Sequence, residues 1–297
     1  MKYCLGTVQF GLDYGIQGGK HPNREKVGQM LDYAISHGIT TFDTASAYGE
    51  AESVLGWYIR DRKKENSPLN IVSKLRPDAF NGQQKEEWKD IVEKNVKESL
   101  ERIGVSKFKA YLFHNAAYIF DPHAVEALYT AVDKGYSEMI GVSVYSPDEA
   151  MKALEYSLIK SIQIPYNVFD RRLDNCHFFE KAKENGVTVY ARSSLLQGLV
   201  MMDPDALPEK VTFARPYLCR FLEICKKYGM PPLNAAIGYA ASKKGIDYIV
   251  FGVDNIKQLE EYISLESQKI SDEMIKEFDE TFNTVEEKLV NPSLWNK

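Results

Sequence analysis

The chain has 297 residues, of which 44% are hydrophobic and 27% are charged, and its formal net charge is −5 at pH 7. This composition is typical of a globular domain with a sizeable core and excludes an intrinsically disordered chain. The net charge is negative and the basic doublets are isolated, so we expect no binding to nucleic acid. No long apolar run occurs, so we expect no membrane insertion.

Apolar runs alternate with helical patterns from one end of the chain to the other, which is typical of parallel strands joined by crossover helices. Eight runs are predicted as strands, at residues 4–10, 40–44, 70–74, 110–114, 140–144, 161–166, 188–193 and 248–253. Helices are predicted between them, at residues 25–37, 90–104, 122–134, 147–157 and 175–185. Gly38, Gly104, Gly135 and Gly186 stand where these helices are expected to end.

Neither a linker nor a break in composition divides the chain, so we expect a single domain over residues 1–297. Eight strand-and-helix units predict a closed (β/α)8 TIM barrel rather than an open doubly wound sheet. Residues 201–214 and 270–297 exceed the minimal unit. They are expected either to contact substrate at the barrel rim or to pack on the barrel wall.

The four cysteines have neither CxxC spacing nor neighbouring histidines: Cys4, Cys176, Cys219 and Cys225. This spacing predicts neither a metal site nor a disulfide framework. Reduced thiols and a start without an export signal indicate a cytoplasmic protein.

Polar side chains end three consecutive predicted strands, where barrel enzymes hold their reacting groups. Asp43 ends the second strand, Lys74 the third and His114 the fourth. Each has an ordinary alternative, because an aspartate at a strand end is often a helix cap and a lone histidine often lies in a core. Together they predict one site at the barrel mouth.

Tyr48 lies on the loop just after Asp43. A phenol is a poor acid at neutral pH unless a nearby cation stabilises its phenolate. We expect Asp43 to hold Lys74, and Lys74 to act on Tyr48. His114 would then orient a carbonyl oxygen by hydrogen bonding.

On these residues the chain resembles the aldo-keto reductase superfamily over nearly its whole length. FDTASAYGEAESVLG at 42–56, SK at 73–74 and FHN at 113–115 match that family's catalytic motifs in order and position. The resemblance implies a catalytic tetrad of Asp43, Tyr48, Lys74 and His114. It also implies a nicotinamide dinucleotide bound across the barrel mouth without a GxGxxG loop, and many relatives have an N-terminal floor hairpin for which this chain has no room.

Three further motifs are similar to the family's cofactor-binding segments: GVS at 141–143 with SIQIPYN at 161–167, ARSSLLQGL at 191–199, and FGVDNIKQLEEYI at 251–263. The implied cofactor-binding residues are Ser143, Gln163, Arg192, Ser193, Leu195, Gln197, Gly252, Asp254, Asn255, Gln258 and Glu261. Arg192 stands at the family's aromatic position. It could stack on the nicotinamide and favour the reduced form, bind an acidic substrate, or form a salt bridge at the rim.

Asp254 stands where many relatives carry a serine or a basic residue. A carboxylate there would repel the 2′-phosphate of NADPH and could accept a hydrogen bond from the free ribose of NADH. Lys257 is the nearby compensating cation. We therefore expect weak discrimination, with NADP(H) slightly favoured and NAD(H) possible.

The sequence thus predicts an NAD(P)H-dependent reductase of a small aldehyde or ketone, sugar-like or otherwise hydroxylated. A non-catalytic cofactor-binding regulatory or partner module remains the alternative, and an unrelated barrel lyase or hydrolase is disfavoured. Tyr14, Tyr145, Phe169, Trp295 and Arg192 are candidates for lining the mouth, although packing roles are equally open. Nothing in the sequence predicts an oligomeric state.

Overall fold

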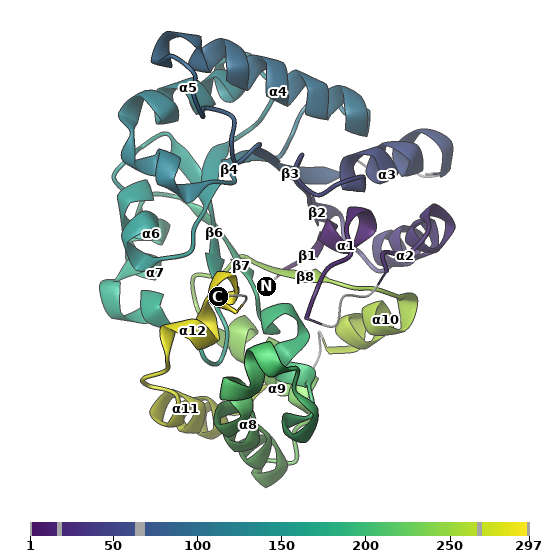
Figure 1. Ribbon diagram of the computed structural model, residues 1–297, viewed down its shortest axis with the longest axis vertical. Coiled ribbons are helices and arrows are strands. Elements are labelled where there is room, and N and C mark those ends of the chain that lie inside the picture. Colours follow the sequence, from purple (N-terminus) through teal and green to yellow (C-terminus); the bar gives the residue numbers. More distant parts are fainter. Residues whose placement is uncertain (1, 17–19, 63–68, 266–268, 296–297) are drawn as a thin grey trace.

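Parallel strands that close into a barrel form the centre of the protein (Figure 1). The computed structural model describes residues 2–16, 20–62, 69–265 and 269–295. Within them the strands pair in the order β1 to β8 and back to β1. They are β1 (Lys2–Gly6), β2 (Thr41–Asp43), β3 (Asn70–Leu75), β4 (Ala110–Phe113), β5 (Ile140–Ser143), β6 (Ile159–Pro165), β7 (Thr188–Arg192) and β8 (Tyr248–Gly252). The predicted (β/α)8 barrel is confirmed.

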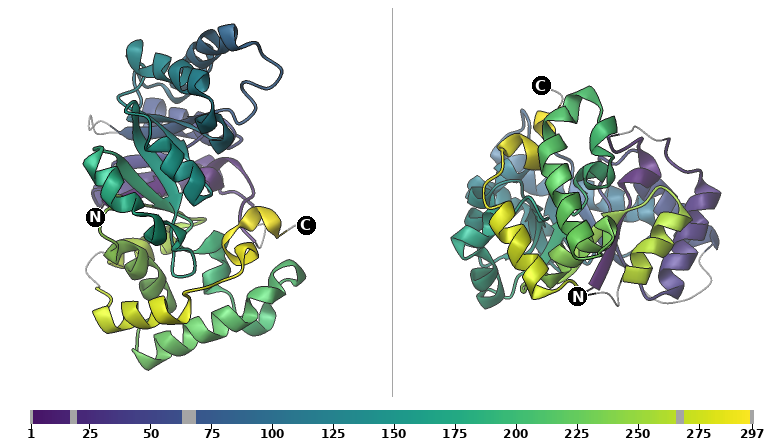
Figure 2. Two further views of the ribbon diagram at one scale, coloured as in Figure 1. Left: turned by 90° about the vertical axis from the view of Figure 1, so that its left-hand side faces the viewer. Right: turned by 90° about the horizontal axis from the view of Figure 1, so that it is seen from below.

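Helices surround the barrel in all the views of the ribbon (Figure 2). They are α1 (Val8–Gly11), α2 (Arg24–Ser36), α3 (Ala51–Trp57), α4 (Trp88–Ile103), α5 (Pro122–Asp133), α6 (Pro147–Ala153), α7 (Phe178–Glu184), α8 (Arg215–Lys227), α9 (Pro232–Ser242), α10 (Ile256–Ser264), α11 (Asp272–Thr281) and α12 (Glu287–Val290). A π-helical turn follows α3 at Tyr58–Arg62. Short 3₁₀ turns occur at Lys85–Glu87, Ala116–Phe120, Arg172–Cys176, Leu196–Met201, Pro204–Ala206, Glu209–Ala214 and Pro292–Leu294.

The helix α4 shows how the sequence pattern produces these elements. Its predicted stripe of Val92, Val96, Leu100 and Ile103 is buried. The helix ends where Gly104 adopts a φ of 78°, a left-handed conformation that glycine adopts without a Cβ clash. The same reasoning holds at the other predicted helix ends, where Gly38, Gly135 and Gly186 also have positive φ.

The first strand differs from the prediction of residues 4–10. β1 ends at Gly6, and residues 8–11 form α1. The cause is Thr7, whose backbone N–H and Oγ1 both donate to the carbonyl oxygen of Asp43, at 2.9 and 3.0 Å. These bonds end the strand and bring the chain across the mouth of the barrel.

Two predicted helices are shorter than expected. The helix predicted at 147–157 ends at Ala153. The helix predicted at 175–185 is a 3₁₀ turn followed by α7, because His177 between them has a φ of 56°.

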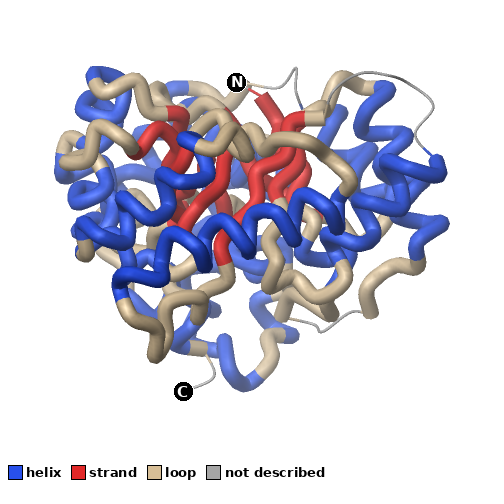
Figure 3. The backbone as a smooth tube through the Cα atoms, turned by 90° about the horizontal axis from the view of Figure 1, so that it is seen from above, coloured by secondary structure: helices blue, strands red, loops and turns tan. Residues whose placement is uncertain are grey.

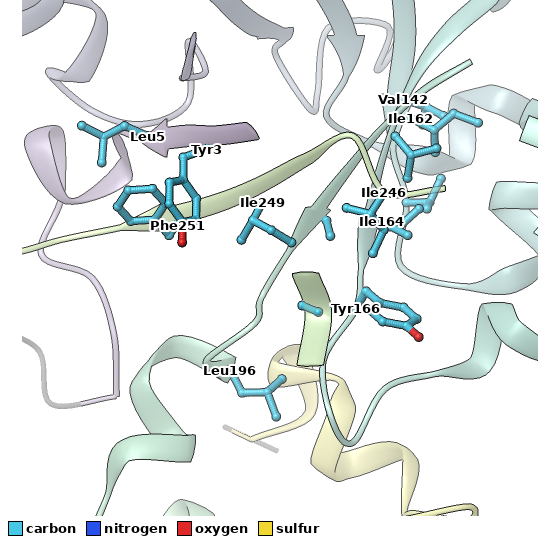
Figure 4. Packing of buried hydrophobic residues seen from close by; sticks show 14 of the residues in the cluster. Tyr3, Leu5, Val142, Ile162, Ile164, Tyr166, Leu196, Ile246, Ile249 and Phe251 are labelled. Carbon is cyan, nitrogen blue, oxygen red and sulfur yellow. The ribbon is translucent and has the colours of Figure 1, made fainter. Parts of the chain in front are cut away.

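Side chains that alternate along the strands divide the core into two layers. Inside the barrel, Cys4, Val72, Ala110, Leu112 and Tyr190 form one cluster. The larger cluster lies between the strands and the helices, and Figure 4 shows part of it, including the edge-to-face contact of Tyr3 with Phe251 (ring centroids 5.3 Å apart). The inward positions nearest the carboxyl ends of the strands are polar and belong to the site described below.

The two ends of the barrel are built differently. Every described strand belongs to the barrel, so the described residues include no floor hairpin. A hollow of about 270 Å³ lies at the amino ends of the strands, lined by Lys2, Thr41, Asn70 and Tyr248 among others. At the carboxyl ends, Pro292 and Ser293, which follow α12, lie at the mouth, and Figure 3 shows the strands at the centre of the molecule with helices around them. None of the described helices has the length and apolar character of a membrane-spanning segment.

Candidate active site

A cavity of about 770 Å³ opens at the carboxyl ends of the strands. Its volume lies within the range of roughly 300–1,000 Å³ that is usual for ligand sites. Most of the predicted site residues line it: Asp43, Tyr48, His114, Ser143, Arg192, Ser193, Leu195, Gln197, Gly252, Asp254, Gln258 and Glu261. Lys74, Gln163 and Asn255 are not among the lining residues, but each forms a hydrogen bond with a residue that is.

A buried ion pair forms the base of the cavity. Lys74 is 1% exposed, and its Nζ donates to Asp43 Oδ1 at 2.7 Å, to Oδ2 at 2.8 Å and to the carbonyl oxygen of Thr44 at 2.9 Å. Burial alone would lower the pKa of Lys74, but Asp43 and Tyr48 outweigh it and the pKa lies above its ordinary value. The lysine is therefore a permanent cation. Gln163 Nε2 donates to Asp43 Oδ1, so its amide supports the pair.

Tyr48 lies directly above this cation. Its hydroxyl is 3.4 Å from Lys74 Nζ, and the ammonium is 5.0 Å from the centre of the ring. Burial raises the pKa of the Tyr48 phenol above its ordinary value, Lys74 acts in the opposite direction, and the net shift is upward. Tyr48 consequently keeps its proton at neutral pH.

The loop that carries Tyr48 is held by two glycines in close contact. A Cβ on Gly11 would lie 2.1 Å from the carbonyl oxygen of Tyr48, and a Cβ on Gly49 would lie 2.3 Å from the carbonyl oxygen of Gly11. Gly49 also has a φ of 55°, which suits glycine. The glycine beside the phenol therefore allows α1 to pack directly against the tyrosine loop.

His114 completes the group. Its ring meets the Tyr48 ring edge to face, with centroids 5.5 Å apart and an interplanar angle of 89°. Burial, with added repulsion from Lys74 and Arg192, lowers the pKa of His114 to about 3. Its Nδ1 is buried without a hydrogen-bond partner in the structure. His114 is thus a neutral imidazole that faces the cavity.

Arg192, at the end of β7, reaches across β6 to the end of β5. Its Nε donates to Ser143 Oγ at 3.3 Å, Nη1 to Ser193 Oγ at 3.2 Å, and Nη2 to the carbonyl oxygen of Val144 at 2.7 Å. The guanidinium carbon lies 4.3 Å from the centre of the Tyr145 ring. Among the described residues no carboxylate pairs with it, so the predicted salt bridge at the rim is not formed there.

The loop after β7 has an unusual backbone. Ser193, Leu196 and Gln197 have φ values of 63°, 47° and 56°, which side chains other than glycine rarely adopt. Such conformations tend to gather at functional sites. Ser194, in the same loop, lines the cavity with its hydroxyl buried and unpartnered.

The far end of the cavity is formed by the end of β8 and by α10. Asn255 accepts a hydrogen bond from the Gln258 N–H at 3.1 Å and caps α10, and Gln258 Oε1 accepts from the Asp254 N–H at 2.8 Å. Asp254 and Glu261 line this end with exposed carboxylates. It therefore carries negative charge, in contrast to the Arg192 end.

Several lining residues were not predicted from the sequence. Gln9 lies over Gly252, with its buried Oε1 unpartnered. Its segment was predicted as a strand, so its position on α1 could not be foreseen. Met201 and Met202 come from the extended loop after β7, and Pro292 and Ser293 from the extended C-terminal segment. Both extensions thus contribute residues to the rim of the cavity.

The aromatic candidates divide evenly between the cavity and the core. Tyr14 and Tyr145 line the cavity. Phe169 is 2% exposed and packs edge to face on Phe282, with centroids 4.8 Å apart. Trp295 is 4% exposed, and its indole donates to the carbonyl oxygen of Lys288 at 2.7 Å, which anchors the C-terminal segment beside the rim.

Comparison with known proteins gives consistent results. The model of the "Aldo/keto reductase family" matches residues 2–283. Aldo-keto reductase str7 of Strobilurus tenacellus is 26% identical over 91% of this chain and 84% of its own length. The NADH-specific methylglyoxal reductase of Escherichia coli (strain K12) is 24% identical over 91% of this chain and 95% of its own length. The solved structure of aldo-keto reductase AKR11C1 from Bacillus halodurans (holo form) has a TM-score of 0.75 at 21% identity, covering 94% of this chain and 91% of that one.

Proposed function

The chain belongs to the aldo/keto reductase family of oxidoreductases, and from that premise we propose that it reduces an aldehyde or ketone with Tyr48 as the proton donor. The observation that carries this proposal is the position of Lys74 Nζ, bonded to Asp43 and 3.4 Å from the Tyr48 hydroxyl at the base of the cavity. His114 packs on the Tyr48 ring in the same cavity. A carbonyl oxygen at the Tyr48 hydroxyl would therefore meet a proton donor.

The family's NAD(P)H fits the residues that line the cavity. Gln9, His114 and Ser194 each present a buried polar atom without a partner, spread over different strand ends. Such atoms are costly unless a ligand or water satisfies them. Ser193, Leu195 and Gln197 on one side, and Gly252, Asp254, Gln258 and Glu261 on the other, would hold it, while Asn255 shapes the start of α10.

Each member of the tetrad has one task in this proposal. The reduced nicotinamide, when bound, supplies the hydride for the carbonyl carbon. Tyr48 transfers its phenolic proton to the carbonyl oxygen, and the Lys74 ammonium stabilises the phenolate that remains. Asp43 fixes Lys74 and compensates its charge. His114, being neutral, orients the carbonyl by hydrogen bonding and does not itself compete to deliver the proton.

The test is to replace Tyr48 with Phe and to assay NADPH and NADH oxidation with a panel of aldehydes and ketones. We expect turnover to fall by about a hundredfold or more, because acid catalysis is typically worth 10²–10⁴ in rate. Cofactor binding, followed by fluorescence, should be retained. Cofactor binding without turnover of any carbonyl compound by the unmodified protein would instead favour the alternative, a non-catalytic cofactor-binding module.

We propose further that NADPH and NADH bind with similar affinity. Asp254 and Glu261 both line the β8 end of the cavity, whereas Lys257 is exposed on α10 and is not among the lining residues. A 2′-phosphate held at this end would meet two carboxylates without a lining cation.

Replacement of Asp254 with Ser should tighten NADPH binding by about tenfold and leave NADH binding nearly unchanged, because a pair of exposed charges about 4 Å apart interacts by about 1 kcal/mol in water. The matched control is Glu260→Gln, which removes an exposed carboxylate from the adjoining helix α10 but outside the cavity. A thousandfold preference of the unmodified protein for NADPH would refute the proposal.

A further inference from the structure

Arg192 carries a charge that the described part of the protein does not neutralise. Its guanidinium donates only to uncharged oxygens, those of Ser143, Ser193 and Val144. The other cation of the cavity, Lys74, is compensated by Asp43. The neighbouring Arg172 is likewise paired with Asp170. Arg192 is therefore the cation in this region for which an anion is missing.

The guanidinium is fixed in place rather than free to swing into solvent. Three hydrogen bonds hold its nitrogens, and the Tyr145 ring covers one face. Tyr145 is itself positioned by its backbone, because its N–H donates to Glu149 Oε2 at 2.6 Å and its carbonyl accepts from Arg172 Nη2 at 3.0 Å. A guanidinium has five N–H donors, and each terminal nitrogen keeps one beyond those used here. Two parallel donors suit a carboxylate.

The charge also acts at the place where a substrate carbonyl would lie. Arg192 lines the same cavity as Tyr48 and His114. It reaches toward β5, away from β8 and the carboxylates of Asp254 and Glu261. The charge of Arg192 acts to lower the pKa of both Tyr48 and His114, and the negative charge lies at the other end of the cavity.

We propose that Arg192 is a specificity-determining residue that binds the carboxylate of an acidic carbonyl substrate. Reduction of such a substrate rests on the proposed function, whereas binding of its carboxylate to Arg192 does not. The substrate class is an oxo acid or aldehyde acid, whose carbonyl reaches Tyr48 while its carboxylate accepts hydrogen bonds from the Arg192 fork.

The first experiment measures binding alone and does not depend on catalysis. Isothermal titration calorimetry of the full chain with benzoate and with benzamide, each without cofactor and with NADH or NADPH present, compares an anion with a neutral molecule of the same shape. We expect benzoate binding to weaken by about ten- to a hundredfold in Arg192→Gln, the usual range for a lost charged hydrogen-bond partner. Arg192→Lys should recover part of the affinity, and benzamide should be insensitive.

The matched control is Arg76→Gln. Arg76 is an exposed arginine at the carboxyl end of β3, it pairs with Asp78 at 3.0 Å, and it is not among the lining residues. Benzoate affinity should be unchanged in this variant. Equal benzoate affinity in the unmodified protein and Arg192→Gln, or no benzoate binding in any cofactor state, would overturn the inference.

The second experiment measures turnover with 4-carboxybenzaldehyde and 4-nitrobenzaldehyde, which have similar shape but different charge. Their intrinsic reactivities differ, but this difference cancels when the ratio of their rates is compared between the unmodified protein and the variant. We expect the ratio of their kcat/KM values to fall by about tenfold or more in Arg192→Gln, mainly through KM for the acid. A ratio unchanged by the substitution contradicts the inference. Failure to reduce either aldehyde while benzoate still depends on Arg192 would count against the reductase proposal and leave the anion site supported.

Discussion

The pKa of His114 leads to a quantitative prediction about stability. Replacing His114 with Gln removes a titratable ring but keeps a polar side chain of similar length. In the native protein the pKa of His114 is lowered to about 3 from an ordinary value of 6.5, chiefly by burial and then by Lys74 and Arg192. In the unfolded chain the ring should titrate normally.

The sign follows from proton binding in the two states. As the pH falls below 6.5, the unfolded chain takes up a proton at His114 while the native protein does not, so the unfolded state is favoured. Above pH 6.5 the ring is neutral in both states and its titration does not affect the free energy of unfolding. From pH 6.5 down to about pH 3, this free energy falls progressively. Between pH 7 and pH 5 the loss is about 2 kcal/mol, at 1.36 kcal/mol for each pH unit below the unfolded value.

Urea unfolding of the unmodified protein and of His114→Gln, each at pH 7 and pH 5, measures this effect. The other titrating groups contribute almost equally to both proteins, so the change with pH in their difference isolates His114. We expect the unmodified protein to lose about 2 kcal/mol relative to the variant on going to pH 5. If the difference stays constant within about 0.5 kcal/mol, which is an ordinary error for such extrapolations, the inference that His114 stays neutral in the native protein is wrong.

Three further substitutions test other parts of the structure. Lys74→Met should lower the free energy of unfolding by about 3–5 kcal/mol, because it leaves the buried Asp43 carboxylate unpaired. In urea unfolding, the double variant with Asp43→Asn should recover part of this loss. If Lys74→Met alone is as stable as the unmodified protein, the buried ion pair is contradicted. Glu52→Gln should lower the free energy of unfolding by about 1–3 kcal/mol and leave turnover intact. Glu52 is 1% exposed, accepts from Ser73 Oγ at 2.8 Å and pairs with Arg102 outside the cavity. Loss of turnover in a folded variant would contradict a purely structural role for Glu52. Gly11→Ala should slow turnover at least tenfold, because its Cβ would lie 2.1 Å from the Tyr48 carbonyl oxygen and must displace the loop that carries Tyr48. Gly238→Ala is the control and should not slow turnover, because the nearest neighbour of its Cβ would lie at 3.5 Å. Identical kinetics for the two variants would show that the position of Tyr48 does not depend on Gly11.

The group of side chains at the base of the cavity could be predicted from the sequence because it follows from strand periodicity. Asp43, Lys74 and His114 each end an apolar run, and parallel strands bring such ends to one side of a barrel. The α4 stripe and its terminal glycine are equally local patterns. These features depend on neighbours a few residues apart.

The features that were missed depend on contacts between distant segments. The apolar residues after Gly6 continue the strand pattern, and only the bonds from Thr7 to the carbonyl oxygen of Asp43 turn the chain into α1 and place Gln9 in the cavity. The direction of Arg192 is set by Ser143 and Val144, and Ser293 reaches the rim because Trp295 is anchored on Lys288. Sequence spacing carries no signal for any of these contacts.

Closure of the barrel has a consequence for how the protein is made. β1 pairs with β8 along its whole length, from Lys2 with Tyr248 to Gly6 with Gly252. The strand β1 is synthesised before the other strands of the barrel, and one of its edges stays uncovered until β8 has been made. Such distant pairing is typical of slow folding. During translation this edge can pair with other chains, so we expect the yield of native protein to depend on growth temperature and on chaperones.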